Sequence, residues 1–341
     1  MIIRSDNYIT KPLVACGIIV YNQKDFIAQC IEGMLQQQCD FPFNIVVADD
    51  CSTDGTQDIL RTYQQKYPDK IKLVLNEKNG GIAANWVSCC RAMEGGDYVS
   101  FCDGDDYWSN TKKLQLQVDY LRAHPKCVAV SSDFDTMNAD GSNYVSCSRS
   151  TCPPLTGSVQ QDLWSRGKAQ NAWCTFMFPK KVFDEHMPLQ GFIEHNFPFQ
   201  DWPALVVMSG YGEFDYMPVS TCVVRQVVGS DSNAVDLEKL ARRQERCRSM
   251  NKYLASLFPD VLPVDDDETF DRYIALTMIS LCIQKGDYEK AKELACKSGH
   301  KNFRYWCCQT RLTFWIFRVA KLGREKLSAL KQKMFVSHIK S

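Results

Sequence analysis

Residues 13–50 read LVACGIIVYNQKDFIAQCIEGMLQQQCDFPFNIVVADD and contain an apolar segment, an amphipathic segment and a second apolar segment, in that order. Leu13–Val20 and Phe43–Ala48 are apolar runs with many β-branched residues, which favour buried strands. Between them, Lys24–Gln37 has apolar residues at helical spacing. A strand, a helix and a strand in this order predict a βαβ unit with parallel strands.

The same alternation continues to about residue 135. It predicts helices at 56–67, 82–93 and 111–123 and strands at 71–75, 98–102 and 127–131. The fold class is therefore α/β, with a mostly parallel sheet covered by helices on both faces. Right-handed crossovers place the loops after the strands at one edge of the sheet, where open α/β sheets bind ligands.

From Ala139 to about Arg225 the alternation stops, and prolines, glycines and aromatic residues become frequent. We expect an irregular lobe here, of the kind that commonly forms the acceptor or substrate wall of a site. Its expected elements are a helix after Asp201 and strands at Cys174–Phe178, Phe214–Met217 and Thr221–Arg225.

A turn-rich hinge at 228–233 precedes a region with helical periodicity, where helices are expected at 237–258, 270–284, 287–296 and 303–330. We expect a first domain at 1–230, with a nucleotide-sugar half at 1–135 and an acceptor and catalytic-base half at 136–230. The C-terminal helical region at 231–341 ends in a basic tail, 297–341.

Charge distinguishes this tail from the rest of the chain. Lys plus Arg and Asp plus Glu number 40 each, so the net charge of zero gives no sign of nucleic-acid binding. The tail alone holds eleven basic residues and one acidic residue. Arg304, Arg311 and Arg318 recur every seven residues, on one helical face beside an aromatic one. Two interpretations stay open: this helix lies on an anionic membrane, or its aromatic face packs on the catalytic domain.

The seventeen cysteines are odd in number and show no C-x-x-C spacing, which is typical of a reducing compartment rather than a disulfide or zinc framework. The N-terminus lacks the apolar core of a signal peptide, and no apolar stretch approaches the roughly 20 residues of a membrane span. We expect a cytoplasmic protein, with a peripheral position on the inner face of the membrane as the alternative.

Two acidic clusters follow predicted strands. In FCDGDDYW, residues 101–108, the carboxylates of Asp103, Asp105 and Asp106 are crowded, and a divalent cation is the usual partner of such crowding. An acidic surface turn is the alternative. In VVADDCSTDGT, residues 46–56, Asp54 and its neighbours can cap a helix. Capping does not explain Asp50 and the aspartate before it, which lie where a base or ribose would bind.

Four motifs together carry a resemblance to a known family. GIIVYN at 17–22, ADDCSTDGT at 48–56, NGG at 79–81 with Asn85, and DGDDYW at 103–108 occur in the order and spacing of family 2 glycosyltransferases. The resemblance covers roughly the first 135 residues. It implies a GT-A fold, which is Rossmann-like, and inverting transfer from a nucleoside-diphosphate sugar, with a UDP-sugar favoured.

The resemblance also implies roles for single residues. Tyr21 would lie beside the base, and Asp50 would accept a hydrogen bond from it, with Asn79 and Asn85 in the same nucleotide-sugar site. Asp103 and Asp105 would contact the ribose and a Mn²⁺ or Mg²⁺ ion. Asp106 can share the contact with the metal.

Two further motifs match imperfectly. In PFQDW, residues 198–202, Asp201 matches the family's general base, but Gln200 replaces its acidic neighbour. In VRQVVGS, residues 224–230, Arg225 and Ser230 match a stretch that closes over the diphosphate, whereas Val227 replaces its histidine. His195 is a possible substitute for that histidine.

The sequence thus predicts a metal-dependent inverting glycosyltransferase of hexosyl or N-acetylhexosaminyl type. It would act on a glycan or lipid-linked acceptor, and no nucleic-acid partner is expected. A nucleotidyltransferase that forms nucleotide sugars is the enzymatic alternative, but it would need a glycine-rich basic loop where Val20–Lys24 stands. A non-catalytic nucleotide-sugar-binding or scaffold protein is the other alternative.

Overall fold

The first βαβ unit is present as predicted. In this computed structural model, β2 (Val14–Val20) and β3 (Phe43–Asp49) run parallel and are joined by α1 (Ile27–Leu35). The structure describes residues 1–146, 154–167, 171–227, 237–263, 267–297 and 306–321.

Two more strands extend this unit into a four-stranded parallel sheet in the order β4-β3-β2-β5. Its remaining elements are α2 (Thr56–Lys66), β4 (Ile71–Leu75), α3 (Ile82–Ala92), β5 (Tyr98–Asp103) and α4 (Lys113–Ala123). The chain leaves each strand through a helix and returns parallel, so all four strands present their carboxyl ends at one edge.

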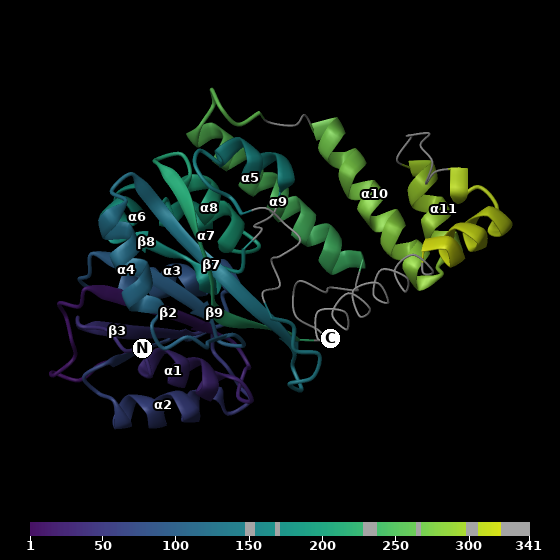
Figure 1. The fold of residues 1–341 in the computed structure, drawn as a ribbon. Coiled ribbons are helices and arrows are strands. Elements are labelled where there is room, and N and C mark those ends of the chain that lie inside the picture. Colours follow the sequence, from purple (N-terminus) through teal and green to yellow (C-terminus); the bar gives the residue numbers. More distant parts are fainter. Residues whose placement is uncertain (147–153, 168–170, 228–236, 264–266, 298–305, 322–341) are drawn as a thin grey trace, which may run out of the picture. The chain divides into compact units, whose positions relative to one another are not determined.

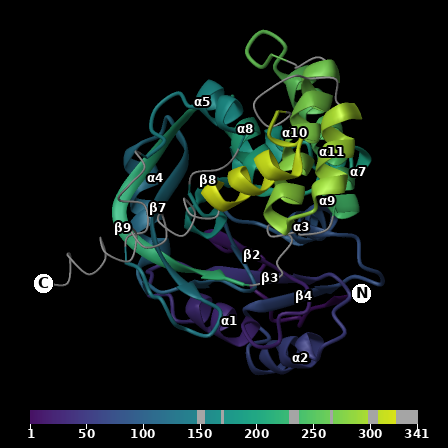
Figure 2. The same ribbon diagram turned by 90° about the vertical axis from the view of Figure 1, so that its right-hand side faces the viewer.

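Antiparallel strands complete the sheet, whose full order over the described residues is β1-β4-β3-β2-β5-β8-β7-β9-β6. The added strands are β1 (Ile2–Ile3), β6 (Tyr107–Trp108), β7 (Cys127–Asn138), β8 (Met177–Pro179) and β9 (Glu213–Gln226). Only β7 and β9 pair in parallel among them, and Figure 2 shows these two long strands curving side by side. The sheet is parallel where crossover helices connect its strands and mixed beyond β5.

Helices cover both faces of the parallel part, as expected for the α/β class. Figure 1 shows α1 and α2 on one side of β2 and β3 and α3 on the other. The first face buries an aliphatic core that includes Ile18, Ile31 and Leu60. On the second face Trp86 of α3 lies 5.9 Å from the ring of Phe101. Both faces of each strand are therefore apolar, which explains the nearly continuous apolar runs in the sequence.

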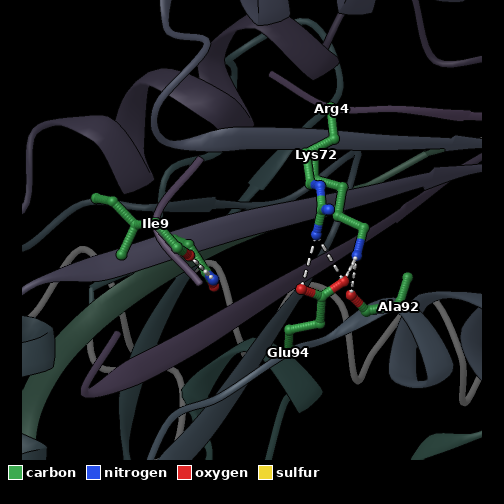
Figure 3. Close-up of polar contacts among 6 residues, drawn as sticks. Arg4, Ile9, Lys72, Ala92 and Glu94 are labelled. Carbon is green, nitrogen blue, oxygen red and sulfur yellow. Dashed lines mark hydrogen bonds and ion pairs between the residues drawn. The ribbon is translucent and has the colours of Figure 1, made fainter. Parts of the chain in front are cut away.

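A buried lysine in β4 interrupts one of these runs. The Nζ atom of Lys72 donates to the carbonyl of Ala92 at 2.7 Å and to Glu94 Oε1 at 2.6 Å. Arg4 donates to the same carboxylate, as Figure 3 shows. These charge-assisted bonds offset the burial of Lys72 and tie β4 to the segment after α3.

The lobe between β7 and β9 is more helical than expected. It contains α5 (Gln160–Arg166), a 3₁₀ turn at Trp173–Thr175, α6 (Lys180–His186), α7 (Leu189–Glu194) and α8 (Asp201–Met208). The predicted helix after Asp201 is confirmed as α8. The strand expected at Cys174–Phe178 is largely wrong, because the 3₁₀ turn occupies its first half. α6 and α7 follow Pro179 and Pro188 directly, since proline suits the start of a helix.

Strand β9 joins two strands that the sequence separates. Pro218 interrupts their pattern, because it lacks an amide hydrogen for the ladder. The register between β7 and β9 shifts at this point, from Ser132 opposite Met217 to Asp133 opposite Ser220. The irregularity lets one strand continue through the proline.

The chain divides into two compact units, residues 1–228 with 249–262, and residues 229–248 with 263–341. Helix α9 (Leu237–Leu257) contributes to both. The second unit also contains α10 (Asp267–Lys285), α11 (Tyr288–Lys297) and a helix at 311–321. Gly286 turns the chain between α10 and α11 with φ of 81°, a conformation that favours glycine.

The helix at 311–321 shows where one aromatic residue of the basic tail packs. Phe314 is fully buried in the second unit, in a cluster with Ile283 of α10 and Ala291 of α11. The aromatic side therefore packs within the helical unit itself. Arg304 lies outside the described residues. Within the described part of the chain, no helix has the length and apolarity needed to cross a membrane.

Candidate active site

The acidic turn 103–106 connects β5 to β6 at the carboxyl edge of the parallel strands. The amide of Gly104 donates to the carbonyl of Ile19 at 2.9 Å, and the amide of Asp106 donates to that of Asp103 at 3.0 Å. A Cβ atom on Gly104 would lie 2.4 Å from Gln23 Oε1 and 3.1 Å from Val20 Cβ, so a larger residue would have to displace the side chain of Gln23. The turn is thereby held against the loop that follows β2.

The three carboxylates of this turn have more negative charge than the neighbouring cation, Arg225, offsets. Burial raises the pKa of Asp103 well above its ordinary value, and the charges of Asp105 and Asp201 raise it further. Burial raises the pKa of Asp106 in the same way, and the charges of Asp105 and Asp103 add to the shift. The pKa of Asp105 is also raised by burial, although the charge of Arg225 opposes the shift. The turn is a place where added positive charge would be stabilised.

The three carboxylates differ in what they contact. Asp106 is buried, and its Oδ1 accepts a hydrogen bond from the amide of Arg225 in β9 at 2.9 Å. Asp103 and Asp105 are partly exposed. Asp106 thus connects the turn to β9, whereas Asp103 and Asp105 are better placed to meet a ligand.

Arg225 is held on several sides. Its guanidinium lies between two rings, 5.1 Å from the centroid of Phe26 and 4.8 Å from that of Tyr107. It also donates to the carbonyl oxygen of Asp105 and to Gln29 Oε1. Arg225 is therefore a cation held in a fixed position beside the acidic turn. Phe26, Gln29 and Tyr107 carry no local signal for this site in the sequence, because only the pairing of β6 with β9 and the packing of α1 on β6 bring them to Arg225.

Helix α8 carries the predicted general base to the same turn. Asp201 is the first residue of the helix, where the helix dipole favours a carboxylate. The side chain of Gln200 donates to Asp103 Oδ1 at 3.3 Å, and the charge of Asp201 contributes to the raised pKa of Asp103. Residues distant in the sequence therefore meet at the end of β5.

The acidic cluster after β3 holds the loops of the sheet edge in place. Asp49 Oδ2 accepts from the amide of Ser52 at 3.0 Å and from Gln57 Nε2 at 2.6 Å. Asp54 caps the start of α2 at the amide of Thr56 and also accepts from the amide of Lys24 at 3.0 Å. These contacts connect the loop after β3 to the loop after β2.

The carboxylate of Asp50 also forms hydrogen bonds within the protein. Its Oδ1 accepts from the amide of Gly80 at 2.9 Å, and its Oδ2 accepts from the amide of Gly81 at 2.8 Å. Asn76 Nδ2 lies 3.3 Å from Oδ1. The carboxylate therefore positions the glycine loop before α3, and its remaining acceptor capacity can still serve a base.

The other predicted nucleotide-sugar residues lie at this edge in different settings. Tyr21 follows β2 and is 47% exposed. Asn79 is exposed in the glycine loop. Asn85 is buried, and its Nδ2 donates to the carbonyls of Ala48 at 2.9 Å and of Val20 at 3.3 Å. Asn85 thus joins the ends of β3 and β2, whereas Tyr21 and Asn79 are accessible.

His195, the possible substitute for the missing histidine, packs against α9. His195 stacks on the ring of Tyr253 at 4.3 Å, and its Nδ1 lies 3.3 Å from Ser249 Oγ, both on α9. Ser230 lies outside the described residues. Among the residues that the structure describes, no group of three or more His, Cys, Asp or Glu side chains is arranged to hold a metal ion by itself.

A parallel α/β half with an acidic turn after its last strand, and a second acidic residue at the start of a later helix, fits the GT-A fold that the sequence motifs imply. The family model described as Glycosyl transferase family 2 matches residues 16–187, half of the chain. The chain belongs to this family, and the predicted family resemblance and GT-A fold are confirmed.

Relatives match over part of their length. An uncharacterised protein of Mycobacterium tuberculosis is 30% identical over 210 residues, which cover 61% of this chain and 57% of the relative. The putative teichuronic acid biosynthesis glycosyltransferase TuaG of Bacillus subtilis is 35% identical over 133 residues, 38% of this chain and 50% of the relative. The chain thus spans about half of the length of these relatives.

Solved structures with a similar fold are more distant in sequence. S. aureus TarS 1–349 is 16% identical, with 90% of this chain and 91% of that chain covered and a TM-score of 0.49. A mannosyltransferase of Pyrobaculum calidifontis, solved with GDP-Man and Mn²⁺, is 19% identical, with 91% and 87% covered and a TM-score of 0.49.

Proposed function

We propose that this glycosyltransferase inverts the configuration of the sugar that it moves from a nucleoside-diphosphate sugar, in particular a UDP-sugar, to an acceptor hydroxyl. The observation that carries the proposal is the contact between the start of α8 and the acidic turn, where Gln200 donates to Asp103 Oδ1 at 3.3 Å beside Asp201. It puts a candidate proton acceptor next to the carboxylates expected at the donor. Family membership supports sugar transfer over nucleotide-sugar synthesis or mere binding.

The donor would lie along the carboxyl edge of β3, β2 and β5. In this arrangement the exposed ring of Tyr21 stacks on the base, and Asp50 accepts a hydrogen bond from it while holding the loop that contains Asn79. Asp103 would bind the ribose. Arg225, fixed between two aromatic rings, would face the diphosphate.

A divalent cation fits the residues of the acidic turn. Asp103 and Asp105 are partly exposed carboxylates with raised pKa values, so a cation would relieve their repulsion. Mg²⁺ is commonly bound by one or two carboxylates together with substrate phosphates and water, so a preformed protein cage is not required. We propose Asp105 and Asp103 as the ligands of Mn²⁺ or Mg²⁺, with Asp106 holding the turn and able to share the metal. When bound, the ion would supply positive charge that stabilises the diphosphate leaving group.

Asp201 would act on the acceptor. Its carboxylate takes the proton of the acceptor hydroxyl as the oxygen forms a bond to the anomeric carbon and the bond from that carbon to the diphosphate breaks. One displacement from the face opposite the leaving group inverts the configuration. Because Gln200 donates to Asp103, it keeps the start of α8 beside the donor carboxylates.

The proposal extends to the acceptor and to the location of the enzyme. The putative teichuronic acid biosynthesis role of TuaG favours a polysaccharide or lipid-linked glycan as the acceptor, extended by a hexosyl or N-acetylhexosaminyl unit. All cysteines among the described residues are free thiols, in keeping with a reducing, cytoplasmic compartment. A peripheral position at an anionic membrane surface would bring such an enzyme to lipid-linked acceptors.

A donor screen tests the proposal. The protein would be incubated with UDP-glucose, UDP-N-acetylglucosamine, UDP-galactose and GDP-mannose in Mn²⁺, and release of the nucleoside diphosphate would be measured. We expect release from at least one UDP-sugar and its loss in Asp201→Asn. Formation of pyrophosphate from a nucleoside triphosphate and a sugar phosphate would instead support the nucleotidyltransferase, and donor binding without turnover would support a scaffold.

A further inference from the structure

The helix at 311–321 exposes an apolar stripe. Leu312, Trp315, Ile316 and Val319 are spaced i, i+3, i+4 and i+7, so they share one helical face. Their exposed fractions are 71%, 44%, 60% and 67%. We call these four residues the apolar stripe. Figure 1 shows this helix at the yellow end of the colour scale.

The stripe is not the side by which the helix packs into its unit. Phe314, on the other side of the helix, is fully buried, and its ring lies 5.4 Å from that of Tyr288 in α11. Phe317 packs on the same cluster. The helix therefore has one apolar side that is covered and a second that is open, and a contiguous open apolar face marks an interaction surface.

Basic side chains fix the helix on its unit. Arg318 donates to the carbonyl of Ile283 at 3.1 Å, at the end of α10. Lys321 donates to Ser280 Oγ at 2.7 Å. Arg311 pairs with Glu289 at 2.7 Å. The arginines at 311 and 318 thus have partners within the unit. The side chain of Arg311 is still 74% exposed, so the outward-facing surface of the helix holds the stripe and this paired arginine.

Charge selects the partner of the stripe. The tail 297–341 has eleven basic residues against Glu325 as its one acid, and those at 324, 326, 331, 333 and 340 follow the helix in the sequence. A second copy of the chain would bring a tail with the same positive charge and be repelled. A nucleic acid would offer phosphates but nothing to cover leucine, isoleucine and valine. An anionic lipid surface satisfies both requirements, because the headgroups attract the cations and the acyl boundary accepts the apolar side chains.

We propose that the apolar stripe binds the surface of a bilayer that contains anionic lipid, to which the positive charge of the tail sequence is attracted. Trp315 and the exposed Trp306 suit this position, because indole rings favour the boundary between headgroups and acyl chains. The proposal concerns the second unit alone and does not depend on the transfer reaction.

Vesicle flotation with the full chain tests this proposal. Wild-type protein would be mixed with vesicles of phosphatidylcholine alone or with 30% phosphatidylglycerol. We expect at least roughly tenfold more bound protein on the anionic vesicles, and a blue shift of tryptophan fluorescence on binding. The triple variant Leu312→Gln, Ile316→Gln and Val319→Gln should lose at least roughly tenfold in vesicle affinity.

A matched control separates the stripe from general loss of apolar surface. Ile2, Ile193 and Leu257 are also exposed, and their replacement by Gln together should leave vesicle binding unchanged. Because all six positions are exposed, both triple variants should fold, which circular dichroism and donor hydrolysis would check. Binding should weaken with salt, as the Debye length falls from about 10 Å at 0.1 M to about 3 Å at 1 M.

Three outcomes would overturn the proposal. The first is equal recovery of the wild type with neutral and anionic vesicles, or with neither. The second is unchanged binding of the stripe variant. The third is a dimer in light scattering that the stripe variant dissociates while vesicles have no effect, because it would make a second copy the partner.

Discussion

The acidic clusters after β3 and after β5 lie on either side of the end of β2, where Val20 pairs with Asp49 and Ile19 pairs with Asp103. After β3, the carboxylate of Asp50 accepts two backbone amides, at 2.9 and 2.8 Å. After β5, Asp103 accepts a 3.3 Å bond from Gln200 and faces the charges of Asp105 and Asp201.

The difference separates two uses of the same side chain. Backbone amides that point at a carboxylate stabilise its charge and fix the loop that supplies them. Carboxylates that mainly face each other repel one another instead, and a cation or a polar ligand can offset this repulsion. The cluster after β3 therefore shapes the edge of the sheet, and the cluster after β5 is the better candidate for chemistry.

Removal of divalent cations should lower the rate of transfer more than any substitution below, because it acts at the cluster after β5. We expect EDTA to lower transfer by about 1,000-fold or more, because a bound cation contributes several kcal/mol at a diphosphate. Asp105→Asn should stay folded and lose metal-dependent donor binding in calorimetry, whereas Asp162→Asn on α5 should not. Full activity in excess EDTA would remove the metal from the proposal.

The next largest effect is expected at Asp201. Asp201→Asn keeps the shape of the side chain but removes the proton acceptor, so turnover should fall at least roughly 100-fold with donor Kd nearly unchanged. Stopped-flow or coupled assays of nucleoside-diphosphate release measure both quantities. Asp184→Asn, at an exposed position on α6, serves as the control. Near-normal turnover of the Asp201 variant would move the base elsewhere in the lobe.

Asp50→Asn tests whether the cluster after β3 stabilises the fold. The amide keeps one acceptor oxygen and loses the other, so an amide of the glycine loop is left without its partner. We expect the free energy of unfolding to fall by about 1–3 kcal/mol. Chemical denaturation followed by circular dichroism measures the change. A variant as stable as the wild type would show that the glycine loop keeps its conformation without this carboxylate.

The smallest effect, of opposite sign, is expected from Asp103→Asn. The substitution removes a charge that burial and two neighbouring aspartates disfavour, so protein treated with EDTA should gain about 1 kcal/mol of stability. Donor binding should weaken at the same time. Loss of stability would contradict the contrast between the two clusters, since it would mean that the charge of Asp103 supports the fold.

The sequence predicts most of the parallel half because each of its elements carries its own signal. Strands such as β2 and β3 are buried on both faces, and their crossover helices are long enough to show periodicity. Helices α5, α6 and α7 are six or seven residues long, too short for a periodic pattern, and depend on packing. The prolines before α6 and α7 favour loops when considered without that context.

The candidate site divides in the same way. The aspartates of the turn after β5, and Asp201, are visible as local motifs. The support around Arg225 is not, because Gln29 and Tyr107 reach it only after distant segments have paired. The amides that hold Asp50 are invisible for a similar reason, since every residue except proline has one. Local chemistry was readable from the sequence, and the contacts that position it were not.

The path of the chain between the two units limits how the protein can be shortened or recombined. Residues 249–262 follow part of the second unit in sequence but belong to the first. There the ring of Tyr253 lies so close to Gly191 that a Cβ atom would be 2.4 Å from it, and Phe258 packs on Tyr211. A chain cut at residue 230 would strip these rings from the lobe that holds Asp201. A cut after Leu262 would keep them but would separate residues 229–248 from the rest of the second unit, so neither point exchanges the two units cleanly.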